Sequence, residues 1–355
     1  MKLPHLATLW LLATSAASCG IITDIVEDDR AGARLLQRSV LRPAWSADNA
    51  TIYYTTRSGT LNTTFTLAAV DIDDMDTRQL TSVSGFNTGG EQVRTISDPS
   101  VVFFAIAKNG HYTIYRASAA GGAAEILASD ASWPWFLVSA NGARIAYRGR
   151  DFSSDSVMVR DVATPATTAG FATPGNPVLL DMSAAGDRVV YGAGGHEYEI
   201  NVTTGEQRRL LRSIDPTFAS TVAPQVLWQS GAPYLLVASL PTGEGARSLD
   251  ISTVNGYTGE RSVLGAIPNA INLPFAMAWS KDGQSFAAWV PVEIVGNNME
   301  RTIYKFRLYA GTANNSLKPL LEWEADESLY WLEFSPNGRR LGLVLYGELY
   351  VVDVE

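Results

Sequence analysis

Hydrophobic and polar positions alternate with a period of two along much of the chain, which is the pattern of half-buried antiparallel strands. This alternation is clear in segments 112–116, 198–202 and 304–308. Each of these segments follows a more continuously apolar run and precedes a short run that ends in leucine. The pattern predicts strands throughout, joined in hairpins, and therefore an all-β chain.

A phrase of strand, tight turn and strand recurs along the chain. The clearest copy spans residues 275–289 and contains Trp279-Ser280-Lys281-Asp282-Gly283. Further copies are centred on Ser46, Ser97, Ser139, Ser183, Ser230 and Ser335. From the first copy to the last, the mean step is about 48 residues, close to that of a four-stranded propeller blade. The repeats therefore predict a seven-bladed β-propeller of four-stranded antiparallel blades.

The two ends of the repeat region predict how the ring closes. The chain finishes at 349–355, which corresponds to the third strand of a blade and leaves one outer strand missing. Segment 33–39 is similar in sequence to segment 207–213, which is expected to be an outer strand, and segment 33–39 belongs to no blade of its own. We expect this N-terminal outer strand to complete the last blade, because closure removes a free sheet edge. Two unrelated β domains would not explain the regular spacing of the repeats.

The N-terminal residues indicate export from the cytoplasm and attachment to a membrane. Lys2 is followed by an apolar stretch and by a run of small residues that ends at Cys19. The run Ala16-Ala17-Ser18 before Cys19 resembles the lipobox of bacterial lipoproteins. We expect a lipoprotein signal peptide at 1–18, a lipidated N-terminus and polar tether at 19–33, and the propeller at 34–355. The alternative is an ordinary signal peptide with an incidental cysteine.

The resemblance to lipoproteins also implies a location. Gly20 follows Cys19, and by analogy with bacterial lipoproteins this favours the outer membrane, with the protein facing the periplasm. The inner membrane and the cell surface stay open as alternatives. We expect contact with the membrane through the lipid anchor alone.

Charge and composition exclude several classes of function. The 355 residues carry a formal net charge of -9, so a phosphate backbone would not be attracted and nucleic acid is not an expected partner. One Cys and three His rule out a disulfide framework and a Cys/His zinc cluster. The chain contains no Gly-x-Ser-x-Gly nucleophile elbow. We therefore expect no cofactor and no serine-peptidase activity.

The repeat units carry a resemblance to a known family. Trp279-Ser280-Lys281-Asp282-Gly283 and Phe334-Ser335-Pro336-Asn337-Gly338 are similar to the repeat signature of TolB-type propellers. The chain resembles the propeller of that family without its preceding α/β domain. The likeness implies a propeller fold and, more weakly, a non-catalytic binding function in the bacterial envelope.

Aromatic and acidic residues gather in segments expected to form loops on one propeller face, where binding residues concentrate. The alternative is that Trp133 and Trp135 begin an inner strand and pack inward. Aromatic side chains rimmed by carboxylates are typical of protein and peptide interfaces. The expected partner is an envelope protein or peptide, or a peptidoglycan-linked partner, carrying a basic patch, and the protein itself is expected to be a monomer. The candidate binding residues are Trp133, Trp135, Phe218, Glu324, Asp326, Glu327, Tyr330 and Trp331.

The alternative function is a propeller enzyme, for example a metal-dependent hydrolase or lyase with its site in the axial channel. Such a site needs carboxylate, His or Asn side chains that converge from the inner strands. The expected inner strands contain mainly Ala, Leu, Val and Trp, with Asp181 and Glu333 as exceptions. These two residues are weak metal candidates, no catalytic residue is assigned, and binding is favoured over catalysis.

Overall fold

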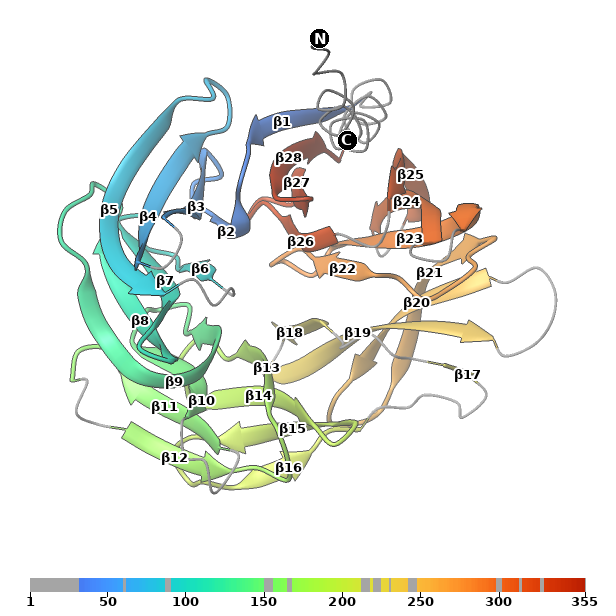
Figure 1. Cartoon of the computed structure of the whole chain (residues 1–355). Coiled ribbons are helices and arrows are strands. Elements are labelled where there is room, and N and C mark those ends of the chain that lie inside the picture. The colour runs from blue at the N-terminus through green and yellow to red at the C-terminus, as the bar shows by residue number, and fades with distance from the viewer. Residues whose placement is uncertain are drawn as a thin grey trace, which may run out of the picture.

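Antiparallel β-sheets surround a central axis like the blades of a propeller (Figure 1). The computed structural model describes residues 32–354, apart from the internal segments 60–61, 87–90, 150–155, 165–167, 212–217, 220–224, 230, 242–247, 298–301, 313–314 and 326–328. Every regular element of the described part is a strand, and no helix there is long and apolar enough to cross a membrane. The predicted all-β class and propeller arrangement are confirmed.

Most sheets consist of consecutive strands that step outward from the axis. One sheet contains β2 (Leu41–Trp45), β3 (Thr51–Ser58), β4 (Asn62–Asp71) and β5 (Thr77–Phe86). Another contains β13 (Val178–Met182), β14 (Arg188–Ala193), β15 (His196–Asn201) and β16 (Gln207–Arg209). A third contains β22 (Ala276–Trp279), β23 (Ser285–Asn297), β24 (Thr302–Thr312) and β25 (Asn315–Ala325). A five-stranded sheet contains β18 (Gln225–Gln229), β19 (Ala232–Pro241), β20 (Ser248–Asn255) and β21 (Arg261–Pro268), with β17 (Phe218–Ala219) also paired to β19.

One sheet is larger than the repeats predict. It contains β6 (Gln92–Thr95), β7 (Val101–Lys108), β8 (His111–Ser118), β9 (Glu125–Val138), β10 (Arg144–Gly149), β11 (Ser156–Asp161) and β12 (Thr168–Ala172). Its long strand β9 pairs with β8 through its first half and with β10 through its second half. The described strands are thus hydrogen-bonded into six sheets, and the number of seven blades stays a prediction.

The two ends of the described chain meet in one sheet. Strand β1 (Ala33–Gln37) pairs antiparallel with β28 (Glu348–Asp353), which continues through β27 (Arg340–Leu345) to β26 (Leu329–Phe334) at the axis. Leu35 lies opposite Tyr350, and the amide of Val40 donates to the carbonyl oxygen of Gly347 at 2.8 Å. The N-terminal strand therefore covers the edge of the last strand, as the sequence predicts.

The recurring Ser-x-Asp/Asn-Gly turns have a structural role. The Ser280 hydroxyl donates to the Asp282 carboxylate at 2.6 Å and accepts the amide of Ser285 at 2.8 Å. Gly283 has φ +70, a left-handed conformation that glycine adopts without strain. Neighbouring turns also hydrogen-bond, for example the Asn337 amide to Asn49 Oδ1 at 2.7 Å. The turns therefore lie on one side of the ring, here called the turn face; the opposite side is the loop face.

The inner strands contact one another around the axis. Strand β2 contacts β6, β6 contacts β9, β9 contacts β13, β13 contacts β18, β18 contacts β22, β22 contacts β26, and β26 contacts β2. The hydrophobic core lies between neighbouring sheets, where Trp289 stacks on Phe306 at 5.3 Å and Trp323 meets Tyr350 at 5.1 Å. This packing fixes the inner strands, and with them the side chains that reach the axis.

Candidate functional site

Four charged side chains from different sheets interact at the axis, and we call them the axial cluster. They are Arg94 of β6, Asp181 of β13, Lys281 in the turn after β22, and Glu333 of β26. Both cations lower the pKa values of both carboxyl groups, which places the four charges within electrostatic range across the ring. The cluster combines two acids and two cations from segments far apart in the sequence.

Strand periodicity sets the direction of the two acids. Side chains of a strand alternate between its two sides. The next residues, Met182 and Phe334, are buried between sheets, with only 6% and 2% of their surface exposed, so Asp181 and Glu333 lie on the other side of their strands. Each acid stands two residues before the serine of its turn. The two carboxyl groups therefore occupy corresponding positions near the turn face.

The surroundings of the two acids change their protonation. Each side chain keeps some accessible surface, yet protein atoms surround both carboxyl groups. Burial raises the pKa of Asp181 to about 7, and the Met182 amide, Arg94 and Lys281 offset only part of this effect. Burial also raises the pKa of Glu333. A carboxyl group with a pKa near 7 exchanges its proton at neutral pH, as a general acid or base must.

Two tryptophans hold Glu333 in place. Trp331 Nε1 donates to Oε2 of Glu333 at 3.1 Å, and Trp45 Nε1 donates to the backbone oxygen of Glu333 at 3.2 Å. Gly342 lies beneath the Trp331 ring, where a Cβ atom would come within 2.4 Å of it. Trp331, expected to belong to an open binding face, is instead partly buried and packed beside the axis.

Trp133 and Trp135 lie in strand β9, as the alternative of an inner strand predicts, and not in a loop. Proline lacks an amide hydrogen and interrupts a strand ladder. At Pro134 the pairing of β9 with β10 is irregular: Phe136 pairs with Tyr147, and the next pair joins Ala131 to Gly149. The bulge leaves Trp133 44% exposed. Trp133 is therefore exposed from a strand and not from a loop.

An arginine links this bulge to the axis. Trp133 and Trp135 meet edge to face at 5.5 Å, and the guanidinium of Arg42 lies 4.7 Å from the centre of the Trp135 ring. Burial and the nearby positive charge of Arg94 lower the pKa of Arg42. Arg94 in turn approaches the carbonyl oxygen of Phe136 at 3.4 Å. Aromatic rings and cations thus form a continuous path from the bulge to the axial cluster.

The sequence reasoning missed Arg42 and Arg94. Both are arginines on inner strands, where the repeats lead one to expect small or apolar side chains. Placing segment 92–95 before the turn at Ser97 would have marked Arg94 as an axial residue. No comparable signal marks Arg42, because its contact with Trp135 joins two sheets distant in sequence.

The remaining candidate residues are not brought together with Trp133 by any described contact. Glu324 is exposed near the end of β25, opposite Lys305 of β24. Phe218 and Tyr330 lie in β17 and β26, where only their backbone is described. Cys19, Asp326 and Glu327 lie outside the described residues.

The axial acids do not fit a metal centre. Asp181 and Glu333 offer two carboxylates, and the described residues contain no group of three His, Cys, Asp or Glu side chains that could hold an ion. Arg94 and Lys281 already act on both acids. A divalent cation needs several oxygen or nitrogen ligands and would be repelled here by Arg94 and Lys281. The donor set suits proton exchange or the binding of a polar ligand.

Known structures share the fold of this chain. No protein-family model matches the chain, and no curated protein matches it in sequence. Among solved structures, the chain is similar to an oligogalacturonate lyase in complex with manganese, with 14% identity over 92% of this chain and 95% of that one and a TM-score of 0.64. An oligogalacturonate lyase from Vibrio parahaemolyticus has 13% identity over 91% and 93% of the two chains, also with a TM-score of 0.64.

TolB structures are also among the matches. TolB from Acinetobacter baumannii has 14% identity over 88% of this chain and 83% of that chain, with a TM-score of 0.44, which is too low to carry an argument. Identities of this size show a shared fold and leave the function to the site itself.

Proposed function

We propose that the protein is a lipid-anchored binding protein of the bacterial envelope that recognises a protein or peptide partner without catalysis. The observation that carries the proposal is the bulge of β9, where Trp133 is 44% exposed beside Trp135 and Arg42. Aromatic residues and arginine are the side chains that most often anchor interfaces. A basic patch on the partner would complement the net charge of -9 and the exposed Glu324.

We also infer that the ring contains seven blades, two of which share β9. The contact path from β2 through β6, β9, β13, β18, β22 and β26 back to β2 supports this count. The shared strand supports it as well, because β9 has the length of two ordinary strands and pairs with β8 and β10 through different halves. In this arrangement β9 ends one blade and begins the next.

The binding proposal is tested with Trp133→Ala in a pull-down from envelope extract. Val263→Ala is the matched control, because Val263 is 61% exposed on the outer strand β21. We expect proteins captured by the wild type and by the control to be lost with Trp133→Ala, since an anchor residue contributes more than about 2 kcal/mol. Equal capture by all three proteins would exclude the bulge as the binding site.

The proposed location and assembly have their own tests. If Cys19 carries the lipid, Cys19→Ser should move the protein from the membrane pellet to the soluble fraction, and labelled palmitate should enter the wild type alone. Separation of inner and outer membranes distinguishes the proposed outer-membrane location from the inner membrane, and protease added to intact cells detects surface exposure. Gel filtration of the unlipidated protein should give the size of a monomer.

The second candidate function is an enzyme acting at the axis, and it rests on the axial cluster, where Asp181 and Glu333 interact with Arg94 and Lys281 and burial raises the pKa of Asp181 to about 7. Two similar structures are named as lyases, one with manganese, but at 13–14% identity they support only the fold. Incubation with oligogalacturonate, followed by ultraviolet absorbance of an unsaturated product, tests this candidate. Product formed by the wild type and lost in Asp181→Asn would replace the binding proposal with catalysis.

A further inference from the structure

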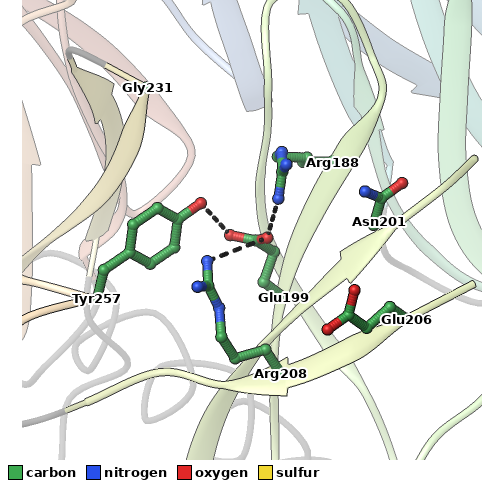
Figure 2. A pocket seen from close by; sticks show the side chains of 7 residues that line it. All are labelled: Arg188, Glu199, Asn201, Glu206, Arg208, Gly231 and Tyr257. Carbon is green, nitrogen blue, oxygen red and sulfur yellow. Dashed lines mark hydrogen bonds and ion pairs between the residues drawn. The ribbon is translucent and has the colours of Figure 1, made fainter. Parts of the chain in front are cut away.

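A polar pocket of about 300 Å³ opens between the sheet β13–β16 and the sheet that contains β18–β21 (Figure 2). Three turns contribute to its wall: the β15–β16 turn, the β18–β19 turn and the β20–β21 turn. Its lining residues are Arg188, Glu199, Asn201, Glu206, Arg208, Gly231 and Tyr257. None of them belongs to the axial cluster or to the β9 bulge.

A buried carboxylate organises this pocket. The Glu199 side chain is only 3% exposed and accepts hydrogen bonds from Arg188 Nη1 at 2.5 Å and from the Tyr257 hydroxyl at 2.6 Å. Arg208 Nη2 also approaches Glu199, at 3.5 Å. Tyr257 comes from the neighbouring sheet, so Glu199 ties the two walls of the pocket together. A buried charge with several partners has a fixed position.

The two arginines are held in place but remain accessible. The guanidinium of Arg208 lies 3.7 Å from the centre of the Tyr257 ring, and the side chain is 47% exposed. The Arg188 side chain is 35% exposed, and its hydrogen bond with Glu199 raises its pKa. Within the described residues, Glu199 is the acid that both arginines share. Each guanidinium has five N–H donors, so both retain donors for a ligand.

The other side of the pocket is negative or neutral. Figure 2 shows the Glu206 carboxylate directed toward the same space and the Asn201 amide nitrogen on the side of Arg188. Asn201 Oδ1 accepts the backbone amides of Thr203 and Thr204, which fixes the orientation of its amide group. The two arginines and two glutamates of the lining balance in charge, so the pocket suits a ligand without net charge.

We propose that this pocket binds a small zwitterion with a carboxylate and an ammonium group, as in a free amino acid. The ligand carboxylate would accept hydrogen bonds from Arg188 and Arg208, the usual partners of carboxylates. The ligand ammonium would lie against Glu206. The pocket volume is at the low end for ligand sites and suits an amino acid rather than a larger molecule. Arg208 covers one face of the Tyr257 ring.

The test is isothermal titration calorimetry of the wild type with L-alanine, propionate, ethylamine and inorganic phosphate at neutral pH. Propionate lacks the ammonium of alanine, and ethylamine lacks its carboxylate. If the pocket binds both the carboxylate and the ammonium group, L-alanine should bind at least about tenfold more tightly than propionate or ethylamine, since one charge-assisted hydrogen bond contributes that much. Tighter binding of phosphate would indicate a simple anion site, and absence of L-alanine binding would indicate a purely structural ion pair; either result overturns the proposal.

Variants assign the two ends of the ligand. Glu206→Gln should weaken L-alanine binding about tenfold without weakening propionate binding, because a carboxylate alone does not need Glu206, whereas Arg208→Gln should weaken both. Glu260→Gln is the matched control, because Glu260 occupies the corresponding position of the β20–β21 turn and does not line the pocket. Equal alanine affinity for Glu206→Gln and wild type would contradict the role of Glu206. Circular dichroism checks that each variant is folded.

Discussion

The axial acids and Glu199 are both surrounded by protein, yet their partners differ. Asp181 and Glu333 interact electrostatically with Arg94 and Lys281, and burial raises both pKa values, that of Asp181 to about 7. Glu199 is in direct contact with Arg188, Arg208 and Tyr257. Burial without an ion-pair partner favours the neutral form of an acid. The comparison teaches that the axis can exchange protons, while the pocket has a fixed arrangement of charges.

The largest expected effect comes from removing the charge of Glu199. Glu199→Gln keeps the shape of the side chain but leaves Arg188 and Arg208 without their shared counter-charge. We expect the free energy of unfolding to fall by about 3 kcal/mol, the lower end for a broken buried ion pair, because both arginines are partly exposed. Urea denaturation at pH 7 measures this change. Glu260→Gln, on the surface, should change it by less than about 0.5 kcal/mol.

At the axis, removing the charge of an acid is expected to raise the free energy of unfolding instead of lowering it. An unfolded aspartate has a pKa of about 3.9, so between about pH 4 and pH 7 the folded protein binds more protons at Asp181 than the unfolded chain does. The contribution of Asp181 to stability therefore falls as the pH rises through this window and is lowest above pH 7. Asp181→Asn should remove this dependence and raise the free energy of unfolding at pH 8 by about 2 kcal/mol.

This figure is below the full value of the pKa shift because Asp181 keeps some accessible surface. Urea denaturation of wild type and Asp181→Asn across pH 4 to 8 makes the measurement. Parallel curves for the two proteins would mean that the pKa of Asp181 is the same in the folded and unfolded states.

A smaller effect is expected from Tyr257→Phe. This change removes the hydroxyl that donates to Glu199 at 2.6 Å and keeps the ring beneath Arg208. The loss of one hydrogen bond to a charged group should lower the free energy of unfolding by about 1.5 kcal/mol, about half the effect of Glu199→Gln. Thermal unfolding of the two variants side by side gives the ratio. A Tyr257→Phe protein as unstable as Glu199→Gln would show that the tyrosine, rather than the arginines, holds the carboxylate.

The smallest effect concerns protonation at the axis. Arg94 lowers the pKa values of Asp181 and Glu333, so Arg94→Gln should raise both by less than about one pKa unit. Carbon-13 NMR titration of the carboxyl groups measures the shift directly. If neither pKa value moves, Arg94 is screened from the acids and burial alone sets their protonation.

The fold followed from local patterns in the sequence. Period-two alternation marked the strands, and the Ser-x-Asp/Asn-Gly phrase marked hairpins whose hydrogen bonds lie within a few residues, as at Ser280 and Asp282. The similarity of segments 33–39 and 207–213 predicted the pairing of β1 with β28. The sequence did not predict that β9 joins β6–β8 to β10–β12 in one sheet. One long strand and two strands separated by a loop have the same short-range pattern of hydrophobic and polar residues.

The candidate sites depend on contacts between distant segments. The sequence alone marked Trp133 as an aromatic residue of a candidate binding segment, and Asp181 and Glu333 as acids on inner strands that otherwise contain mainly Ala, Leu, Val and Trp. Only the tertiary structure placed Arg42 on Trp135, Arg94 near both acids, and Tyr257 against Glu199. Hairpins and turns are formed by residues close together in the sequence, so local patterns predict them. The charge environment of an acid depends on side chains that reach it from other sheets, and only the packing of those sheets decides which ones do.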